Sequence, residues 1–257
     1  MNSFLEEQDV HVNKTDSFAK LINRQRLSPK LWDYSFFLLR NNLHTFTIFR
    51  DLVVSEKKNK ILDVGCGFKP WLDMFDKSQV EYIGVDFDKE KSSADFVASA
   101  DKLPFPDNDF DALIFSEVLE HADNLPGVLG EMRRVARPGA LVYISSPFVF
   151  PEHGIPYDFQ RLTRYFYQRA FEKDEIIVLK ESNSSLATAF ASFNMVGEWT
   201  PFTAIAGLKH LVYSIFNILG LAGDLAVGLL LKIAGEKFRP QFYAMPLGYA
   251  LVVRIRK

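Results

Sequence analysis

The sequence has only one cysteine, Cys66, among 257 residues, so no disulfide can form within the chain. A chain without disulfides suits a reducing compartment. The first ten residues, MNSFLEEQDV, also lack the basic and apolar blocks of a secretory signal. We therefore expect a cytoplasmic protein, either free or held peripherally at the inner face of a membrane.

Net charge is also scarce, because 30 lysines and arginines stand against 32 aspartates and glutamates, a balance of -2. Such a chain offers no field for a polyanion. The sequence also has no zinc-ligand spacing and no basic helix. We expect no nucleic-acid partner and no metal, and the absence of internal repeats excludes solenoid folds.

Apolar residues are plentiful at 48%, enough for a substantial core. From Lys60 onward, short apolar runs alternate with helical stretches at 70–75 and 125–135. Continuous apolarity indicates strands buried on both faces, which is typical of a parallel sheet covered by helices. The predicted strands are 60–65, 82–86, 110–116, 140–146, 175–182 and 250–257.

This pattern predicts an α/β fold with a Rossmann-like, doubly wound, mostly parallel seven-stranded sheet. Residues 1–58 are expected to form a helical prelude or lid, and 59–183 the core with its ligand site. Residues 184–246 form an apolar helical insertion, and 247–257 return as the final strand of the core sheet.

A glycine pair interrupts the stretch ILDVGCGFKP, where Gly65 and Gly67 follow the first strand. In an open parallel sheet, ligands bind at the carboxyl ends of the strands, and a glycine loop that leads into a helix presents backbone N–H groups there. A dinucleotide fingerprint needs a third glycine where this sequence has Pro70. A cofactor without a pyrophosphate therefore fits better.

Residues 60 to about 165 resemble a class I S-adenosylmethionine (SAM)-dependent methyltransferase of the small-molecule branch often called type 11. In that family the loop reads D/E-x-G-x-G-x-G, which Asp63, Gly65 and Gly67 match, while Lys69 replaces the last glycine. The resemblance implies that SAM is the cofactor. It also implies that Asp63 orients the methionine amino group and that the two glycines pass close to the cofactor.

Further acids follow in the order expected for the rest of SAM. Asp86 ends the strand YIGVD, where its two oxygens can accept from the two ribose hydroxyls. The segment SADKLPFPD resembles the family's A-D-x-x-L-P-F, which implies that Asp101 accepts from the adenine amino group and Leu103 borders the ring. The alternative for Asp101 is a helix or turn cap. Ser116 begins the segment that passes beneath the transferring methyl in the resembling enzymes.

Two histidines are candidate catalytic bases for an acceptor hydroxyl. His121 ends the run SEVLEH, and His153 lies in the loop after the fourth long strand. The alternative for His121 is a surface histidine paired with Glu120.

Asp158 and Arg161 in the same loop are candidate substrate contacts. Asp158 could instead cap a helix that begins at Phe159, and Arg161 could clamp an anionic substrate group or pair with Asp158.

Residues 211–231 are nearly long and apolar enough to span a bilayer. The last strand is expected to join the same sheet as the first, so both must lie on one side of any membrane, which excludes a single crossing. Gly220 and Gly223 are expected to break the stretch into a hairpin of two short helices. The open alternatives are peripheral membrane contact through 204–236, which cations flank, and a dry cap or homodimer interface.

The combined expectation is a SAM-dependent methyltransferase that acts on a small or lipid-linked acceptor, such as a glycan or quinone-like intermediate, at oxygen. One alternative is a non-catalytic, membrane-docked SAM-binding protein. Another is a nicotinamide-dependent oxidoreductase on the same topology, against which Pro70 and Asp101 argue.

Overall fold

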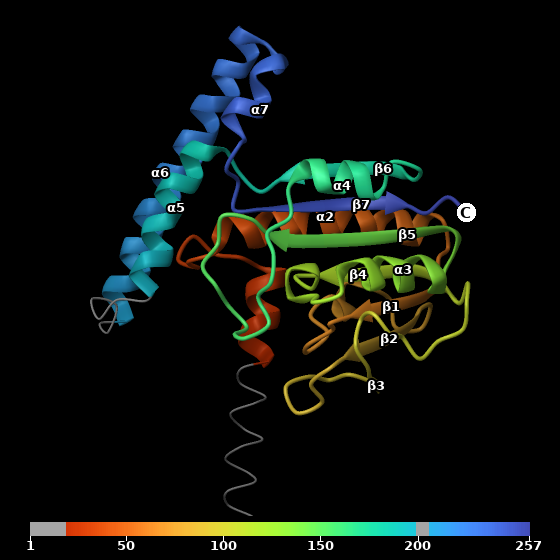
Figure 1. Ribbon diagram of the computed structural model, residues 1–257. Coiled ribbons are helices and arrows are strands. Elements are labelled where there is room, and N and C mark those ends of the chain that lie inside the picture. Colours follow the sequence, from red (N-terminus) through yellow and green to blue (C-terminus); the bar gives the residue numbers. More distant parts are fainter. Residues whose placement is uncertain (1–18, 199–205) are drawn as a thin grey trace, which may run out of the picture.

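A seven-stranded sheet of order β3-β2-β1-β4-β5-β7-β6 forms the centre of the molecule (Figure 1). The computed structural model describes residues 19–198 and 206–257, so the N-terminal stretch behind the expectation about export lies outside it. The strands are β1 (Lys60–Val64), β2 (Glu81–Asp86), β3 (Phe96–Val97), β4 (Phe110–Ser116), β5 (Ala136–Pro147), β6 (Glu175–Glu181) and β7 (Gly248–Arg254). Only β7 runs antiparallel to its neighbours among these strands. The predicted fold class is confirmed. Of the seven strands, β3 is the one that was not among the predicted ranges, because a strand of two residues shows no periodicity in the sequence.

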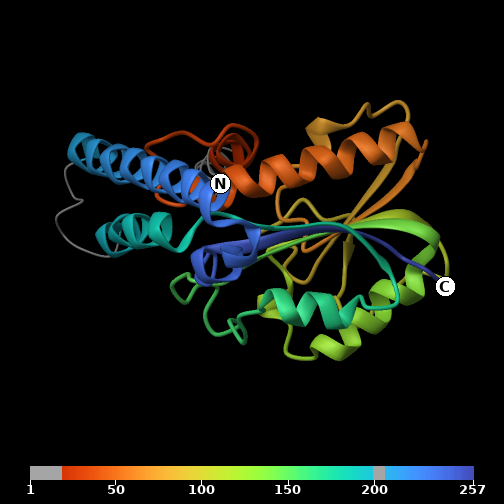
Figure 2. The ribbon, with the colours of Figure 1, turned by 90° about the horizontal axis from the view of Figure 1, so that it is seen from above.

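Both faces of the sheet are covered, as continuous apolarity predicts. Consecutive residues of a strand point to opposite faces. In β4, Leu113 and Ile114 are both fully buried and belong to separate apolar clusters on the two sides. The layers are α2 (Phe36–Ser55) on one face and α3 (Leu125–Val135) with α4 (Arg164–Ala170) on the other (Figure 2).

Helix α2 lies inside the predicted prelude, yet it packs directly on the sheet. Phe46 stacks on Trp71 with ring centroids 4.0 Å apart and meets Tyr143 of β5 edge-on at 5.0 Å. This aromatic group joins α2 to the segment after the glycine loop. Since α2 fills one apolar layer of the core, this part of 1–58 serves as more than a lid.

The glycine loop does not lead into the expected helix over 70–75. The chain forms only a 3-10 turn, η1 (Leu72–Met74), before it reaches β2. Asp76 accepts hydrogen bonds from the backbone and hydroxyl of Ser78 and from Gln79. Such local bonds compete with helical ones, so the segment turns where a helix would continue.

Helix α6 (Ala206–Ala234) is continuous, so the expected break into two short helices within 211–231 is wrong. Its hairpin partner is α5 (Ser185–Glu198), and we call this pair the helical hairpin (Figures 1 and 2). Gly220 and Gly223 are contact points. A Cβ at Gly220 would lie 2.6 Å from Phe37, and one at Gly223 would lie 3.1 Å from Leu186. A short turn, η4 (Glu236–Phe238), and α7 (Arg239–Phe242) then lead back to β7.

Asn217 fastens the helical hairpin to the domain. It is fully buried, and its amide donates to the carbonyls of Leu31 and Asp33 at 2.7 and 3.0 Å. Its oxygen accepts from Asn194 of α5 at 3.0 Å. One polar side chain in an apolar helix thus joins α6, α5 and the segment before α2.

We predict that Asn217→Leu lowers the free energy of unfolding by about 2 to 4 kcal/mol, because the carbonyls of Leu31 and Asp33 and the amide of Asn194 each lose a hydrogen bond. Urea denaturation measures this loss. The matched control is Ser214→Ala, since Ser214 on the same helix donates to the carbonyl of His210 in an exposed position. Equal stability of the two variants would contradict the fastening role.

Candidate functional site

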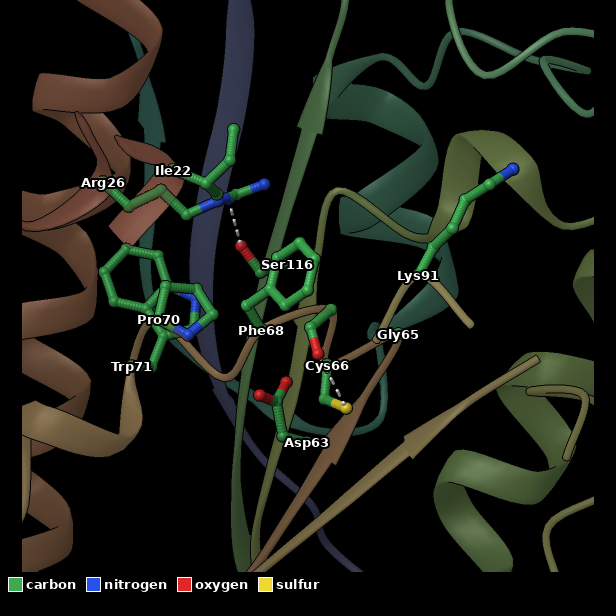
Figure 3. A pocket seen from close by; sticks show the side chains of 11 residues that line it. Ile22, Arg26, Asp63, Gly65, Cys66, Phe68, Pro70, Trp71, Lys91 and Ser116 are labelled. Atoms are coloured by element: carbon green, nitrogen blue, oxygen red, sulfur yellow. Dashed lines mark hydrogen bonds between the residues drawn. The ribbon is translucent and has the colours of Figure 1, made fainter. Parts of the chain in front are cut away.

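A cavity of about 220 Å³ opens where β1 and β4 end (Figure 3). Four of the predicted cofactor-binding residues line it, namely Asp63, Gly65, Gly67 and Ser116. Arg26 and Ile22 reach it from the helical segment 19–27, and Trp71 and Phe68 supply apolar walls. Sequence reasoning missed Arg26, because nothing local marks which side of that helix faces the sheet.

The glycine loop has the backbone that only glycine adopts readily. Gly65 and Gly67 have φ of +66° and +48°. A Cβ on Gly65 would lie 2.5 Å from Val118, so the loop packs on the segment after β4, whereas a Cβ on Gly67 would meet nothing within 4 Å. The Gly67 N–H donates to Asp86 at 3.0 Å, which ties the loop to β2.

Asp63 lies beneath this loop and is almost fully buried. Burial raises the pKa of its carboxyl to about 7, although the hydrogen bond from Tyr82 and the nearby charges of Arg26 and Lys69 act in the opposite direction. Tyr82 donates to one Asp63 oxygen at 2.6 Å. A buried carboxylate at a cavity gains stability from a cationic ligand.

The cavity fits the methionine end of SAM. Asp63 can pair with an ammonium, and the Arg26 guanidinium, which donates to Ser116 Oγ at 3.2 Å, can pair with a carboxylate. Gly67 leaves open space beside them. The ammonium and the carboxylate of that end therefore each have a partner of opposite charge.

The predicted contacts to ribose and adenine lie outside this cavity. The Asp86 oxygens accept from the backbone of Gly67 and Asp88. Asp101 accepts from Ser99 at 2.5 Å and from Asn124 at 3.0 Å, as in the alternative turn role, and these bonds lower its pKa.

Leu103 is buried in the core, with its N–H donating to Glu131. The cofactor roles of Asp86, Asp101 and Leu103 remain predictions.

His121 and His153, predicted separately, lie together at the same edge. Their ring centroids are 4.9 Å apart at an angle of 75°. Both Nε2 atoms approach Glu120 Oε1, at 3.7 and 3.8 Å. Glu120 is fully buried, which no local pattern reveals, since the loop that covers it comes from residues 151–160.

The electrostatics of this group follow from the burial of Glu120. Desolvation raises the pKa of Glu120, while the nearby carboxylate raises the pKa of His153. Both shifts favour the protonated form, so a proton or another positive charge beside the buried carboxylate stabilises this pair. The base roles of His121 and His153 remain predictions.

Asp158 and Arg161 pair with each other through two bonds of 2.5 and 2.7 Å, as one alternative predicted. Arg161 lowers the pKa of Asp158 to about 2. Asp158 also accepts from the His153 N–H at 2.9 Å, so the pair holds the loop in shape. The predicted cap at Asp158 is wrong, because α4 begins at Arg164 and Thr163 caps it. Substrate contact by either residue stays a prediction.

A family model described as a methyltransferase domain matches residues 38–206. The chain belongs to this methyltransferase family. The predicted resemblance to class I SAM-dependent methyltransferases is thus confirmed, and with it the cofactor that the family uses, SAM.

A sterol 24-C-methyltransferase, ERG6B of Gibberella zeae, is 36% identical over 102 residues, which cover 32% of this chain and 26% of the relative. A ubiquinone/menaquinone biosynthesis C-methyltransferase, UbiE of Burkholderia mallei, is 40% identical over 57 residues, which cover 22% of this chain and 24% of the relative. The match spans about a quarter of the length of either relative.

Solved structures of the same fold include a SAM-dependent methyltransferase from Archaeoglobus fulgidus, with a TM-score of 0.51 at 12% identity over 92% of this chain and 99% of that one. The [4+2]-cyclase SpnF has a TM-score of 0.50 at 18% identity over 81% of both chains. At such identities the likeness shows the fold alone, and the site must decide the chemistry.

We predict that Asp63→Asn stabilises the chain increasingly as pH rises. A folded-state pKa of about 7 against an ordinary 3.8 means that folding takes up a proton between these values, so the parent loses stability as pH rises from about 4 to 7. The variant avoids this cost, whose upper bound is about 4 kcal/mol above pH 7.

Urea denaturation at pH 5 and pH 8 measures the difference. The exposed Asp73, which pairs only with Lys77, gives the control Asp73→Asn. A stability difference between Asp63→Asn and the parent that stays constant with pH would contradict the burial argument. Calorimetry at pH 8 should also show SAM affinity at least tenfold lower in Asp63→Asn, because the ammonium partner is gone.

Proposed function

We propose that the protein transfers the methyl group of SAM to an apolar, lipid-linked small-molecule acceptor at a membrane surface. The observation that carries the proposal is the cavity under the glycine loop, whose buried Asp63 suits the ammonium of SAM. The same cavity gives no third glycine for a pyrophosphate, since Pro70 lines it, which speaks against the nicotinamide alternative.

When bound, SAM supplies a methyl group already activated by its sulfonium. The protein therefore mainly has to hold the cofactor, align the acceptor and exclude water. Asp63 and Arg26 hold charged groups in the cavity, and the helical segment 19–27 covers it. The segment around Val118 packs against Gly65, and under this proposal it separates the cofactor cavity from the bound acceptor.

The helical hairpin supports an apolar acceptor. One face of α6 packs on the domain through residues at helical spacing, among them Tyr213, Asn217, Val227 and Leu231. The other face exposes large apolar side chains. They are Leu208, Leu211, Ile215, Ile218, Leu219, Leu225, Leu229, Leu230 and Ile233. By length and composition the stretch Leu208–Ala234 could cross a bilayer, but its packed face favours a helix lying on the surface.

A lipid surface is the occupant that this face fits best. Lys232 in the last turn of α6 and Lys237 in the turn that follows can meet anionic headgroups, whereas Arg239 is paired with Glu236. The carboxyl end of β5, beside the site, points toward the helical hairpin (Figure 1). The partial relatives are named for sterol and quinone methylation, which agrees with an acceptor drawn from a membrane. Under this proposal the protein is cytoplasmic and peripheral.

Oxygen is our proposed acceptor atom, although both partial relatives are named carbon methyltransferases. The support is the group of Glu120, His121 and His153, whose acceptor atoms suit a hydroxyl. Incubation of the chain with methyl-labelled SAM and membrane lipid extracts tests the proposal, and mass spectrometry of the product locates the methyl. No labelled product, with SAM bound, would favour the non-catalytic alternative.

We predict that the chain floats with anionic vesicles and that Leu211→Gln/Ile215→Gln/Ile218→Gln reduces the floating fraction at least fivefold, because about 0.8 kcal/mol is lost for each CH₂ no longer buried in lipid. The matched control replaces three exposed apolar residues elsewhere, Val54→Gln/Phe96→Gln/Val97→Gln. Equal flotation of both variants, or no flotation of the parent, would direct the search to soluble acceptors.

A further inference from the structure

Glu120 is a buried carboxylate that has no hydrogen-bond partner among the residues that the structure describes. It lies in the 3-10 turn η2 (Leu119–His121), has no exposed surface, and neither oxygen accepts a hydrogen bond. A charge in such a place is stable only beside a cation or after protonation. The Arg161 guanidinium, which interacts electrostatically with Glu120, is already bonded through both its terminal nitrogens to Asp158.

Each of the two neighbouring histidines is held by its Nδ1 atom and directs its Nε2 atom toward Glu120. His121 Nδ1 lies 2.5 Å from the carbonyl of Tyr157, and His153 Nδ1 lies 3.2 Å from that of Pro151. Because a carbonyl only accepts, each Nδ1 is the proton-bearing nitrogen, which leaves Nε2 as the nitrogen able to coordinate a metal ion.

Three atoms that can each ligate a metal ion therefore lie close together. The two Nε2 atoms are 3.7 and 3.8 Å from Glu120 Oε1, which is too long for a hydrogen bond. All three ligand atoms lie within 4.8 Å of one another. Ligands at about 2.0 to 2.2 Å from a shared metal ion are separated by about 3 to 4 Å, and both distances from Nε2 to Glu120 Oε1 fall in this range.

We propose that Glu120, His121 and His153 bind a divalent transition-metal ion. The backbone carbonyls on both Nδ1 atoms are the outer contacts that metal-ligating histidines commonly have, since they fix the tautomer and the ring orientation. Gly154 contributes as well, because a Cβ there would lie 2.9 Å from the His121 ring. Its φ of +64° lets the loop close over the site.

The ligand set selects the class of ion. Two imidazoles and one carboxylate suit Zn²⁺, Co²⁺, Fe²⁺ or Mn²⁺, whereas Mg²⁺ and Ca²⁺ prefer oxygen ligands throughout. The histidine side chains are 26% and 30% exposed, so the remaining coordination positions face outward. The sequence predicted no metal because the ligands come from two distant segments without a familiar spacing.

A role for the ion in the reaction rests on the proposed function. A hydroxyl oxygen of the acceptor that coordinates the ion has a lowered pKa. Its proton passes to water, and the oxygen lone pair forms the new bond to the methyl carbon while the pair of the broken carbon–sulfur bond stays on sulfur. Metal binding itself does not depend on this role.

The test uses the full chain without a histidine tag, stripped with a chelator and titrated with Co²⁺ and Zn²⁺ by calorimetry and visible absorption. We expect one ion per chain and a Co²⁺ absorption band typical of nitrogen and oxygen ligands. Glu120→Gln and His153→Ala should each weaken binding at least tenfold. His210→Ala, which changes an exposed histidine on α6, should leave it unchanged.

Absence of binding by the parent, or equal binding by parent and both variants, overturns the inference. Circular dichroism verifies that the variants are folded, and if either unfolds, the Co²⁺ band of the parent decides. SAM affinity measured on the metal-free chain keeps the two proposals separate. SAM binding without metal binding removes only the metal site, and metal binding without SAM binding removes only the proposed function.

Discussion

Burial of the central strands on both faces is the constraint on which the rest of the structure depends. In β1, Leu62 and Val64 pack on the side of α3, while Ile61 packs on the side of α2. Strand alternation places Asp63 on the α2 side as well. The carboxylate is therefore buried because its neighbours are, and its raised pKa follows from its position in the strand.

The site lies at one edge of the sheet because the carboxyl ends of parallel strands meet there. Hydrogen bonds and ion pairs then hold the loops at this edge in place. The Asp158–Arg161 pair and the His153 N–H hold the loop after β5. The Tyr157 ring of that loop contacts Phe87 after β2, with centroids 5.7 Å apart. Segments that follow β5 and β2 thus meet at this edge of the sheet.

The helical hairpin shows how a strongly apolar helix can be held by a domain without being covered by it. Asn217 gives α6 a fixed orientation, and the close contact at Gly220 allows α2 to approach. The opposite face remains apolar and exposed. An orientation fixed by polar bonds is useful where a surface must meet lipid in one defined way, since it places the site relative to the membrane.

Local patterns in the sequence determined the strands, α3, the glycine loop and the family, because continuous apolarity and glycine requirements act within a few residues. The features that sequence-based prediction missed have one physical cause in common. The continuity of α6, the burial of Glu120, the approach of His153 to His121 and the place of Arg26 in the cavity all depend on contacts between distant segments. Only the tertiary structure decided them, since the burial and partners of a side chain are set by whatever packs against it.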